Sequence, residues 1–297
     1  MAILKRLANR SIVYGVVASF CLFAAFPFLW ALITMFKGDW DLYRSGLNPF
    51  LFNKYPTSEI EPGRVVDVVD SPTLENLNLL FNETNYTTYL WNSFFIGMLV
   101  VVITLIIAIP AAYSLARLTG RWGEQAGIAI FLVYLVPPTL LFIPLFRVVV
   151  ELGLNNTLWS MVLVYPTITI PFCTWLLMGF FKSIPRDIEE QALVDGYSRL
   201  GAVFRTVIPL AVPGIIAVVV FAFALTLHEF IYALTFVSDL DQRTVSAGVP
   251  AELIRGDVFR WQSLVAAAVI VALPVALVYS FFLNRLVAGF TMGAVKG

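Results

Sequence analysis

The sequence predicts an all-α membrane protein with six transmembrane helices, and two observations carry this prediction. The first is composition: 60% of the 297 residues are hydrophobic, only 13% are charged, and the mean hydropathy is +0.86. A soluble core does not require so much apolar surface, whereas a chain that crosses a bilayer repeatedly does. The second is the recurrence of long apolar runs between polar segments. The net charge is zero, so no basic field favours nucleic acid as a partner.

Six apolar segments reach the roughly 20 residues needed to cross about 30 Å of hydrocarbon. They are Ile12–Phe36, Phe94–Leu118, Gly127–Val149, Leu158–Phe181, Leu210–Phe236 and Leu264–Leu283. Lys5, Arg6 and Arg10 precede the first segment, as in a secretory signal peptide. The segment is too long for a signal peptide, and no small-x-small cleavage site follows it. We therefore expect it to remain as a membrane anchor.

The distribution of Lys and Arg predicts the orientation, because short cytoplasmic loops carry an excess of these residues. With a cytoplasmic N-terminus, more than half of the 19 cations lie inside, against five of the 19 acids. The inner cations are Lys5, Arg6, Arg10, Arg117, Arg121, Lys182, Arg186, Arg199, Arg205, Arg285 and Lys296. The inner acids are Glu124, Asp187, Glu189, Glu190 and Asp195. Both termini are therefore predicted to be cytoplasmic.

This topology divides the chain into four parts. Residues 1–36 form the N-terminus and first span, 37–93 a long extracytoplasmic loop, 94–286 a core with the other spans, and 287–297 a cytoplasmic tail. In the long loop, the alternating run Gly63–Asp70 suggests a short strand or hairpin. In the second outer loop, Ser238–Gln262, a short helix is expected at Pro250–Arg255.

The most polar segment in the second half of the chain is Ile184–Gly214, here called the polar hook. Pro185 suits the first turn of a helix, and Gly196 suits the left-handed conformation that ends one. Ser198 suits the cap of a second helix, which would stop near Pro209. A loop stiffened into helices presents a fixed surface, which favours docking to a rigid partner.

The sequence carries no recognisable catalytic centre, so we expect a non-catalytic chain that binds no cofactor or metal itself. Gly120–Gly123 lacks the lysine and the spacing of a phosphate-binding loop. The sole histidine, His228, has no serine or cysteine partner at the spacing of a hydrolytic triad. Cys21 and Cys173 are far apart in apolar runs, as expected of buried small hydrophobes. If ATP drives this protein, another chain must hydrolyse it.

His228 and Glu229 form an ionisable pair within the fifth apolar segment. A charge in hydrocarbon costs at least ~2.5–3.5 kcal/mol on insertion scales, so such a residue faces a cavity or a partner. One interpretation is a solute path or gate, in which Glu229, Tyr232 and Phe236 share one helical face. The other interpretation is a polar contact between two membrane helices, or a charge that reaches water at the outer interface.

The polar hook also resembles the EAA loop of ABC-importer permease subunits. That motif runs Glu-Ala-Ala, three residues, Gly, nine residues, a branched apolar residue, one residue, and Leu-Pro. Glu190, Gly196 and Pro209 occupy its fixed positions in this sequence. Three positions depart from it, namely Gln191, Thr206 and Ile208.

The resemblance continues outside the hook, from about residue 90 to the end, and indicates the carbohydrate branch of these permeases. The matching segments are Asn92-Ser93, Ala111–Arg117, Ile143–Leu145, His228–Phe230 and the tail Gly289–Gly297. The tail resembles that of the shorter, six-span permease of maltose-type importers. The branch commonly has Asn where this chain has His228. The long loop 37–93 is unusual for that type of subunit.

The resemblance implies the type I ABC importer transmembrane fold, with 94–286 as its core and 184–209 as its coupling loop. The residues then expected to contact a cytoplasmic ATP-binding subunit are Glu189, Glu190, Gln191, Ala192, Asp195, Gly196 and Arg199. It further implies that this subunit is a dimer that binds ATP and Mg, and that a second, different permease completes the pore. An external solute-binding protein would deliver a sugar. The expected location is the cytoplasmic or inner membrane of a bacterium or archaeon.

Three other interpretations stay open from the sequence. His228 and Glu229 could couple protons to transport in a stand-alone secondary transporter, although no convincing internal repeat supports that class. The polar hook could hold a cytoplasmic partner in a scaffold that moves no solute. An ABC importer of a non-sugar solute would differ only in its substrate.

Overall fold

The computed structural model describes residues 2–56 and 69–294, with side chains within 10–56 and 69–282. The strand expected at Gly63–Asp70 lies largely outside these residues. By its internal contacts the chain divides into two units, residues 1–84 with 252–272 and residues 85–251 with 273–297.

Within the described residues, five helices are long and apolar enough to cross a membrane. They are α1 (Ala2–Thr34), α4 (Tyr86–Arg117), α7 with α8 (Leu158–Val164 and Pro166–Ser183), the helix Arg199–His228, and α14 (Trp261–Ala294). Five of the six predicted spans thus correspond to long helices, and the bent pair Arg121–Tyr134 and Pro138–Glu151 would make a sixth if it is one span. The second of them begins at Tyr86, earlier than predicted, because the polar residues before Phe94 still form helix.

The third predicted span, Gly127–Val149, is two helices and not one. α5 (Arg121–Tyr134) and α6 (Pro138–Glu151) meet at a bend of 87°. Pro137 precedes α6 with an extended ψ of 131°, and Pro138 occupies the first turn. A residue before proline is disfavoured in helical conformation, so this proline pair ends α5 and starts α6 in a new direction.

The fifth predicted span, Leu210–Phe236, is also divided. α11 (Ile208–His228) ends before Glu229, and α12 (Ile231–Phe236) follows. The Glu229 carboxylate accepts hydrogen bonds from the backbone N–H groups of Tyr232 (3.0 and 3.1 Å) and Ala233 (3.1 Å). The carboxylate satisfies free donors at the positive end of α12. The prediction of one helix is wrong because an apolar run does not reveal this break.

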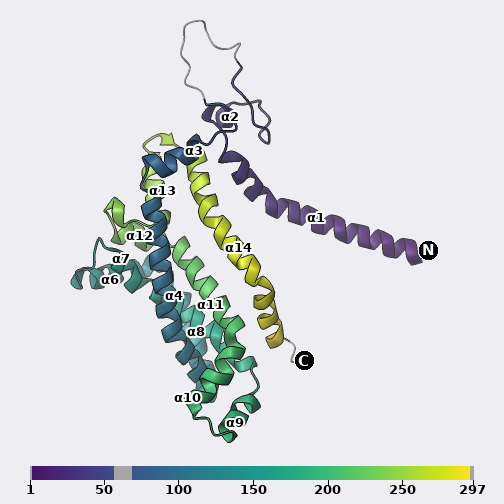
Figure 1. The fold of residues 1–297 in the computed structure, drawn as a ribbon, viewed down its shortest axis with the longest axis vertical. Coiled ribbons are helices and arrows are strands. Elements are labelled where there is room, and N and C mark those ends of the chain that lie inside the picture. The colour runs from purple at the N-terminus through teal and green to yellow at the C-terminus, as the bar shows by residue number, and fades with distance from the viewer. Residues whose placement is uncertain (1, 57–68, 295–297) are drawn as a thin grey trace. The chain divides into compact units, whose positions relative to one another are not determined.

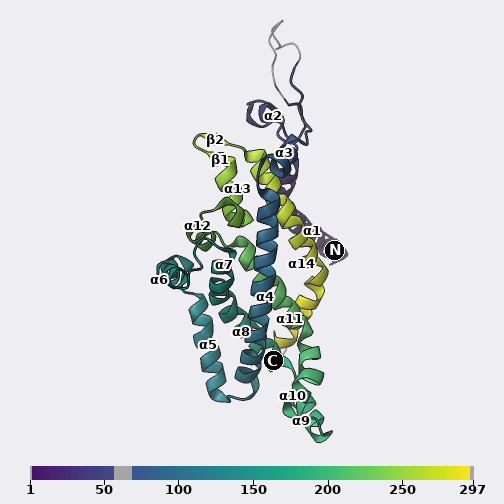
Figure 2. The same cartoon turned by 60° about the vertical axis from the view of Figure 1, so that its left-hand side comes forward.

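The centre of the larger unit is formed by α4, α8 and α11, and α5 packs against α4 and α8. Its buried residues include Ala108, Ala112, Leu177, Phe181 and Val218. Close packing depends on small residues: a Cβ atom at Gly214 would lie 2.4 Å from the ring of Phe180. α9 (Arg186–Val194) and α10 (Arg199–Ala202) lie at the end of this bundle where α4 finishes (Figures 1 and 2).

The second outer loop contains η4 (Leu240–Gln242), α13 (Val245–Leu253) and an antiparallel hairpin of β1 (Ile254–Arg255) and β2 (Val258–Phe259). The helix expected at Pro250–Arg255 is therefore wrong in its bounds. Gly256, with φ of +59°, turns the chain back, so the residues just before it pair as a strand.

The described parts of the long loop 37–93 are ordered around a buried ion pair. They contain α2 (Asp39–Tyr43), α3 (Glu75–Asn78) and the π-helix η2 (Leu79–Glu83). Lys37 Nζ donates to Asp41 Oδ1 at 3.1 Å, and both side chains are 1% exposed. Asn53 donates its backbone N–H (3.1 Å) and its side-chain amide (2.7 Å) to the same carboxylate. Burial alone would raise the pKa of Asp41, but hydrogen bonds from Asn53, Ser71 and Lys37 together lower it below its ordinary value.

Candidate functional site

The first helix of the polar hook, α9, ends in a glycine turn, as predicted. Gly196 has φ of +89°. Its N–H donates to Leu193 O, and the Tyr197 N–H donates to Ala192 O, both at 3.1 Å. This pair of bonds is a common glycine-terminated helix end, and it fixes the direction in which the chain leaves α9. Ser198 then caps α10, also as predicted.

The second helix does not stop near Pro209, so that prediction is wrong. After α10 the chain passes through a π-helix, η3 (Val203–Val207), and continues into α11 as one helix over Arg199–His228. The Ile208 N–H bonds to Val203 O, five residues back. This wider turn accommodates Pro209, which has no N–H and whose ring would crowd the preceding turn of an α-helix. The hook is therefore continuous with the fifth span.

Glu189 holds α9 against the end of α4. The hydroxyl of Tyr113 donates to Glu189 Oε1, and Arg117 Nε lies 3.7 Å from Glu189 Oε2. Arg117 Nη2 also donates to Ile184 O at 2.6 Å, where α8 gives way to the hook. The side chains of Arg117 and Glu189 are only 6% and 13% exposed. Because both charges are shielded from water, removing either side chain would leave the other charge without its ionic partner.

Two of the seven predicted partner-contacting residues do not face outward. Glu189 is occupied by Tyr113 and Arg117, and Ala192 is buried. The remaining five lie at exposed positions: Glu190, Gln191, Asp195, Gly196 and Arg199. The predicted set therefore separates into an inner pair that holds α9 and an outer group that is accessible.

Sequence reasoning missed an apolar surface on the same hook. Val194 is 87% exposed, Leu200 71% and Phe204 65%. Tyr197 is also exposed, and the guanidinium of Arg205 lies 5.2 Å above its ring. Exposed apolar side chains beside carboxylates are typical of protein contact surfaces. The available signal was the presence of large apolar residues in the most polar segment of this half of the chain.

The roles of Tyr113 and Arg117 were also missed. They stand four residues apart at the end of α4, so they lie on one face of that helix. This spacing was the signal that could have identified them.

A pocket of about 340 Å³ opens between the end of α4, α9 and the start of α10. It is lined by Arg117, Leu118, Arg186, Glu189, Glu190, Leu193 and Arg199. Guanidinium and carboxylate groups at one opening are suited to charged side chains of a protein partner.

The second predicted site, His228 with Glu229 and Tyr232, does not form one surface. His228 is exposed at the end of α11, whereas the partly buried Glu229 caps α12. Tyr232 is 0% exposed and packs in a core cluster with Tyr165 and Phe236. The prediction that Glu229, Tyr232 and Phe236 share one helical face is wrong because the helix breaks at Glu229. The described residues contain no group of three or more His, Cys, Asp or Glu side chains that could hold a metal ion.

Comparisons with known proteins identify the family of the chain. Residues 106–291 match the model of a family described as binding-protein-dependent transport system inner membrane component. The chain is 34% identical over 273 residues to the sulfoquinovosyl glycerol transport system permease protein SmoH of Agrobacterium fabrum, with 92% of this chain and 89% of that protein covered. It is 30% identical over 273 residues to the trehalose/maltose transport system permease protein MalG of Thermococcus litoralis, with 92% and 91% covered.

A solved structure of similar fold comes from a bacterial ABC transporter involved in the import of the acidic polysaccharide alginate. The TM-score is 0.71 at 19% identity, and the match covers 92% of this chain and 95% of that one.

Proposed function

The chain belongs to the family of binding-protein-dependent transport system inner membrane components, and we propose that it forms half of a pore through which ATP hydrolysis drives sugar import. It is a permease subunit of an ABC importer. SmoH and MalG are named for the transport of different sugars, which supports the substrate class and leaves the particular sugar open.

The proposed assembly contains partners that hydrolyse ATP and deliver solute. A cytoplasmic dimer of ATP-binding subunits holds ATP and Mg, a second, different permease completes the pore, and an external binding protein presents the sugar. The chain lies in the inner membrane with both termini cytoplasmic, an orientation supported by the excess of Lys and Arg in the loops assigned to that side.

The observation that carries this function is the attachment of the polar hook to two spans at once. Through Glu189, Tyr113 and Arg117, α9 is held to α4. Through the uninterrupted helix Arg199–His228, α10 is continuous with α11. A displacement of the hook is therefore transmitted to both spans, because ion pairs and continuous helices move as units.

The outer surface of the hook supplies the contact with the ATP-binding subunit. Glu190 and Asp195 offer carboxylates to basic side chains or backbone N–H groups of that subunit. Val194 and Leu200, also exposed on the hook, offer apolar anchors. Closure of the nucleotide-bound dimer then pulls on this surface and changes the side of the membrane to which the pore opens.

The test is reconstitution of the chain with an ATP-binding subunit, a second permease and a solute-binding protein from the same organism. We expect sugar uptake into proteoliposomes that requires ATP and the binding protein, and ATP hydrolysis stimulated by the sugar-loaded binding protein. The matched control contains an ATP-binding subunit that binds but does not hydrolyse ATP.

The same experiment separates the competing classes. Uptake by this chain alone, driven by a proton gradient without ATP, would identify a secondary transporter and overturn the proposal. A complex that assembles but moves no solute under any condition would identify a scaffold. ATP-driven uptake of amino acids but of no sugar would leave the importer intact and overturn the substrate class.

A further inference from the structure

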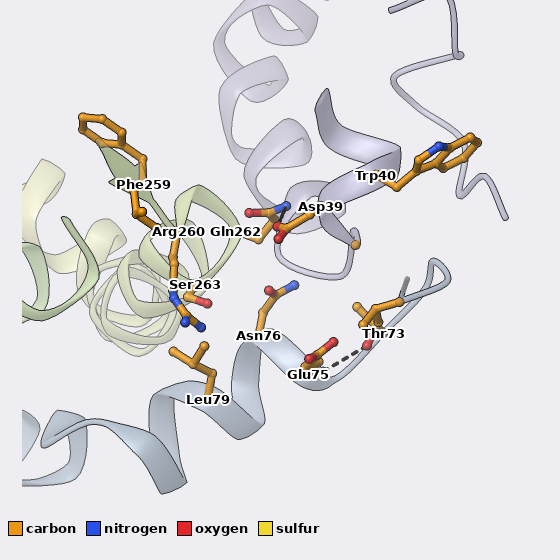
Figure 3. A pocket seen from close by; sticks show the side chains of 13 residues that line it. Asp39, Trp40, Thr73, Glu75, Asn76, Leu79, Phe259, Arg260, Gln262 and Ser263 are labelled. Atoms are coloured by element: carbon orange, nitrogen blue, oxygen red, sulfur yellow. Dashed lines mark hydrogen bonds between the residues drawn. The ribbon is translucent and has the colours of Figure 1, made fainter. Parts of the chain in front are cut away.

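The smaller unit contains a pocket of about 330 Å³ built from two segments far apart in the sequence. One side comes from residues 38–40 and 69–79 of the long loop, and the other from residues 258–263, at β2 and the start of α14. Figure 3 shows Asp39, Glu75, Asn76, Arg260, Gln262 and Ser263 around this space. We propose that the pocket binds an uncharged oligosaccharide, an inference that rests on the proposed transport of a sugar.

The floor of the pocket is rigid and polar. Gln262 and Ser263 are 1% and 2% exposed, and Gln262 Nε2 donates to Asp39 Oδ1 at 2.8 Å. Asn76 Nδ2 donates to Met35 O (3.1 Å) and to Lys37 O (2.9 Å). Side chains fixed in this way lose little entropy when a ligand binds, so their remaining hydrogen-bonding capacity is effective.

Several polar groups around the pocket still have hydrogen-bonding capacity. Both amide protons of Asn76 are used, which leaves its Oδ1 atom as an acceptor. Within the part of the chain that the structure describes, the Glu75 carboxylate and the Arg260 guanidinium make no hydrogen bond or ion pair. Acceptors and a forked donor therefore surround the same space.

This combination favours a neutral, hydroxyl-rich ligand. A small anion would face the carboxylates of Asp39 and Glu75, and a small cation would face Arg260. An apolar ligand would displace water from Asn76 Oδ1, the Glu75 carboxylate and the Arg260 guanidinium without giving them a hydrogen-bond partner. A sugar hydroxyl both donates and accepts, so adjacent hydroxyls can satisfy carboxylate, amide and guanidinium groups together.

An aromatic pair at the rim supplies the apolar contact that the non-polar face of a sugar ring requires. Phe259 and Trp261 are stacked with ring centroids 5.4 Å apart and an angle of 6° between the planes. Both are more than 40% exposed. The ring of Phe259 points away from Gln262 in Figure 3, so this ring lies at the edge of the pocket and not inside it.

The proposal is tested by sugar binding to the purified full-length chain in lipid nanodiscs, without the binding protein. The probes are trehalose and maltotriose as neutral sugars and an alginate trisaccharide as an acidic one, followed by saturation-transfer NMR and calorimetry. The informative variants are Glu75→Gln and Arg260→Gln, because neither side chain has a structural partner among the described residues. Arg255→Gln, on the same hairpin and outside the pocket lining, is the matched control.

We expect saturable binding of at least one neutral sugar, weakened about tenfold by each pocket variant and less than twofold by Arg255→Gln, since a lost charge-assisted hydrogen bond corresponds to about one decade in affinity. Absence of binding, equal affinity in all variants, or tighter binding of the alginate fragment would each overturn the proposal. Weaker docking of the binding protein by Glu75→Gln without any sugar binding would instead identify a protein contact, which also overturns it.

Sugar uptake by the whole importer separates the two levels of inference. If the importer takes up a neutral sugar that the nanodisc-bound chain does not bind, only this pocket assignment fails. If the importer takes up no sugar, the proposed function fails with it.

Discussion

Arg117 Nε lies 3.7 Å from Glu189 Oε2, so the last turn of α4 and the first turn of α9 share one shielded ion pair. The neighbouring Glu190 is exposed instead. Two adjacent glutamates of one helix thus have different surroundings, and we infer different tasks for them. Glu189 connects the hook to its own subunit, and Glu190 is proposed to contact the ATP-binding subunit.

The first prediction separates these tasks with Glu189→Gln and Glu190→Gln. Removing one partner of a shielded ion pair costs on the order of 3 kcal/mol, so Glu189→Gln should loosen α9 from α4. We expect the ATP-binding subunit still to co-purify, while stimulation of ATP hydrolysis by sugar falls about tenfold. Glu190→Gln should instead weaken co-purification itself.

A second substitution tests whether the loss of coupling in Glu189→Gln comes from the broken ion pair with Arg117. Arg117→Met removes the uncompensated charge that Glu189→Gln leaves behind, so the double variant should be less impaired than the sum of the single variants. Strict additivity, or wild-type coupling in Glu189→Gln, would show that the contact transmits nothing.

The second prediction concerns Gly196, whose φ is +89°. A Cβ atom there would meet no atom of this chain within 4 Å, so within the subunit the effect of Gly196→Ala comes from backbone conformation. That conformation costs an L-residue about 1–2 kcal/mol. Gly196→Ala should therefore reduce sugar-stimulated ATP hydrolysis, and Gly196→Asn should reduce it less, because Asn tolerates this conformation.

The control for this prediction is Gly179→Ala. A Cβ at Gly179 also has free space, but its backbone is helical. If Gly179→Ala and Gly196→Ala impair coupling equally, the left-handed turn is not the cause.

The third prediction tests the apolar part of the hook. Val194 is 87% exposed, so Val194→Asp should leave the fold unchanged and weaken binding of the ATP-binding subunit by roughly tenfold or more, as expected for an apolar anchor at an interface. Leu74→Asp replaces another exposed apolar residue, in the outer loop, and serves as control. Binding is measured with the detergent-solubilised permease and the purified ATP-binding subunit. Equal loss in both variants would indicate a general defect.

The glycine turn and the serine cap of the hook could be predicted because their signals are local. A glycine that ends α9 and a serine that caps α10 act through backbone groups within a few positions. The error at Pro209 arose because a π-helix accommodates a proline that would end an α-helix. That accommodation depends on packing between helices, which the local pattern does not contain.

Local sequence signals do not predict the helix breaks inside apolar runs or the contacts that α4 makes. Hydropathy does not distinguish one span from two short helices, so the bend at Pro137 and the cap at Glu229 were missed. Glu189 was predicted to contact the partner subunit. Its actual contacts, Tyr113 and Arg117, lie 76 and 72 positions earlier in the chain, so no local pattern indicates them. Only the folded chain brings them together.

The fourth prediction concerns pH and the buried pair of Lys37 and Asp41. The folded pKa of Asp41 is lowered, so this carboxylate stabilises the folded loop above its unfolded pKa of about 3.9, and the contribution is lost as the pH falls through the folded pKa. We expect hydrogen exchange of residues 37–53 to accelerate below about pH 4, relative to an unstructured reference peptide at the same pH. Asp41→Asn should be less stable at pH 7 and lose this acid dependence. Retention of the dependence in Asp41→Asn would assign it to another group.

The last prediction uses Glu229 to decide between a structural cap and a proton carrier. Its carboxylate accepts the N–H groups of Tyr232 and Ala233, and loss of such a cap costs about 0.5–2 kcal/mol. Glu229→Gln keeps an acceptor oxygen, so we expect sugar uptake within about threefold of wild type, with Glu229→Ala clearly lower. Hydrogen exchange at Tyr232 and Ala233 should accelerate in the Ala variant and change little in the Gln variant.

A proton carrier would give a different result, because Gln cannot titrate. Uptake would then be lost equally in both variants, although hydrogen exchange in the Gln variant would be unchanged. His228→Asn changes the exposed neighbour of the cap and serves as the control. It should retain uptake whether Glu229 is a cap or the sole proton carrier.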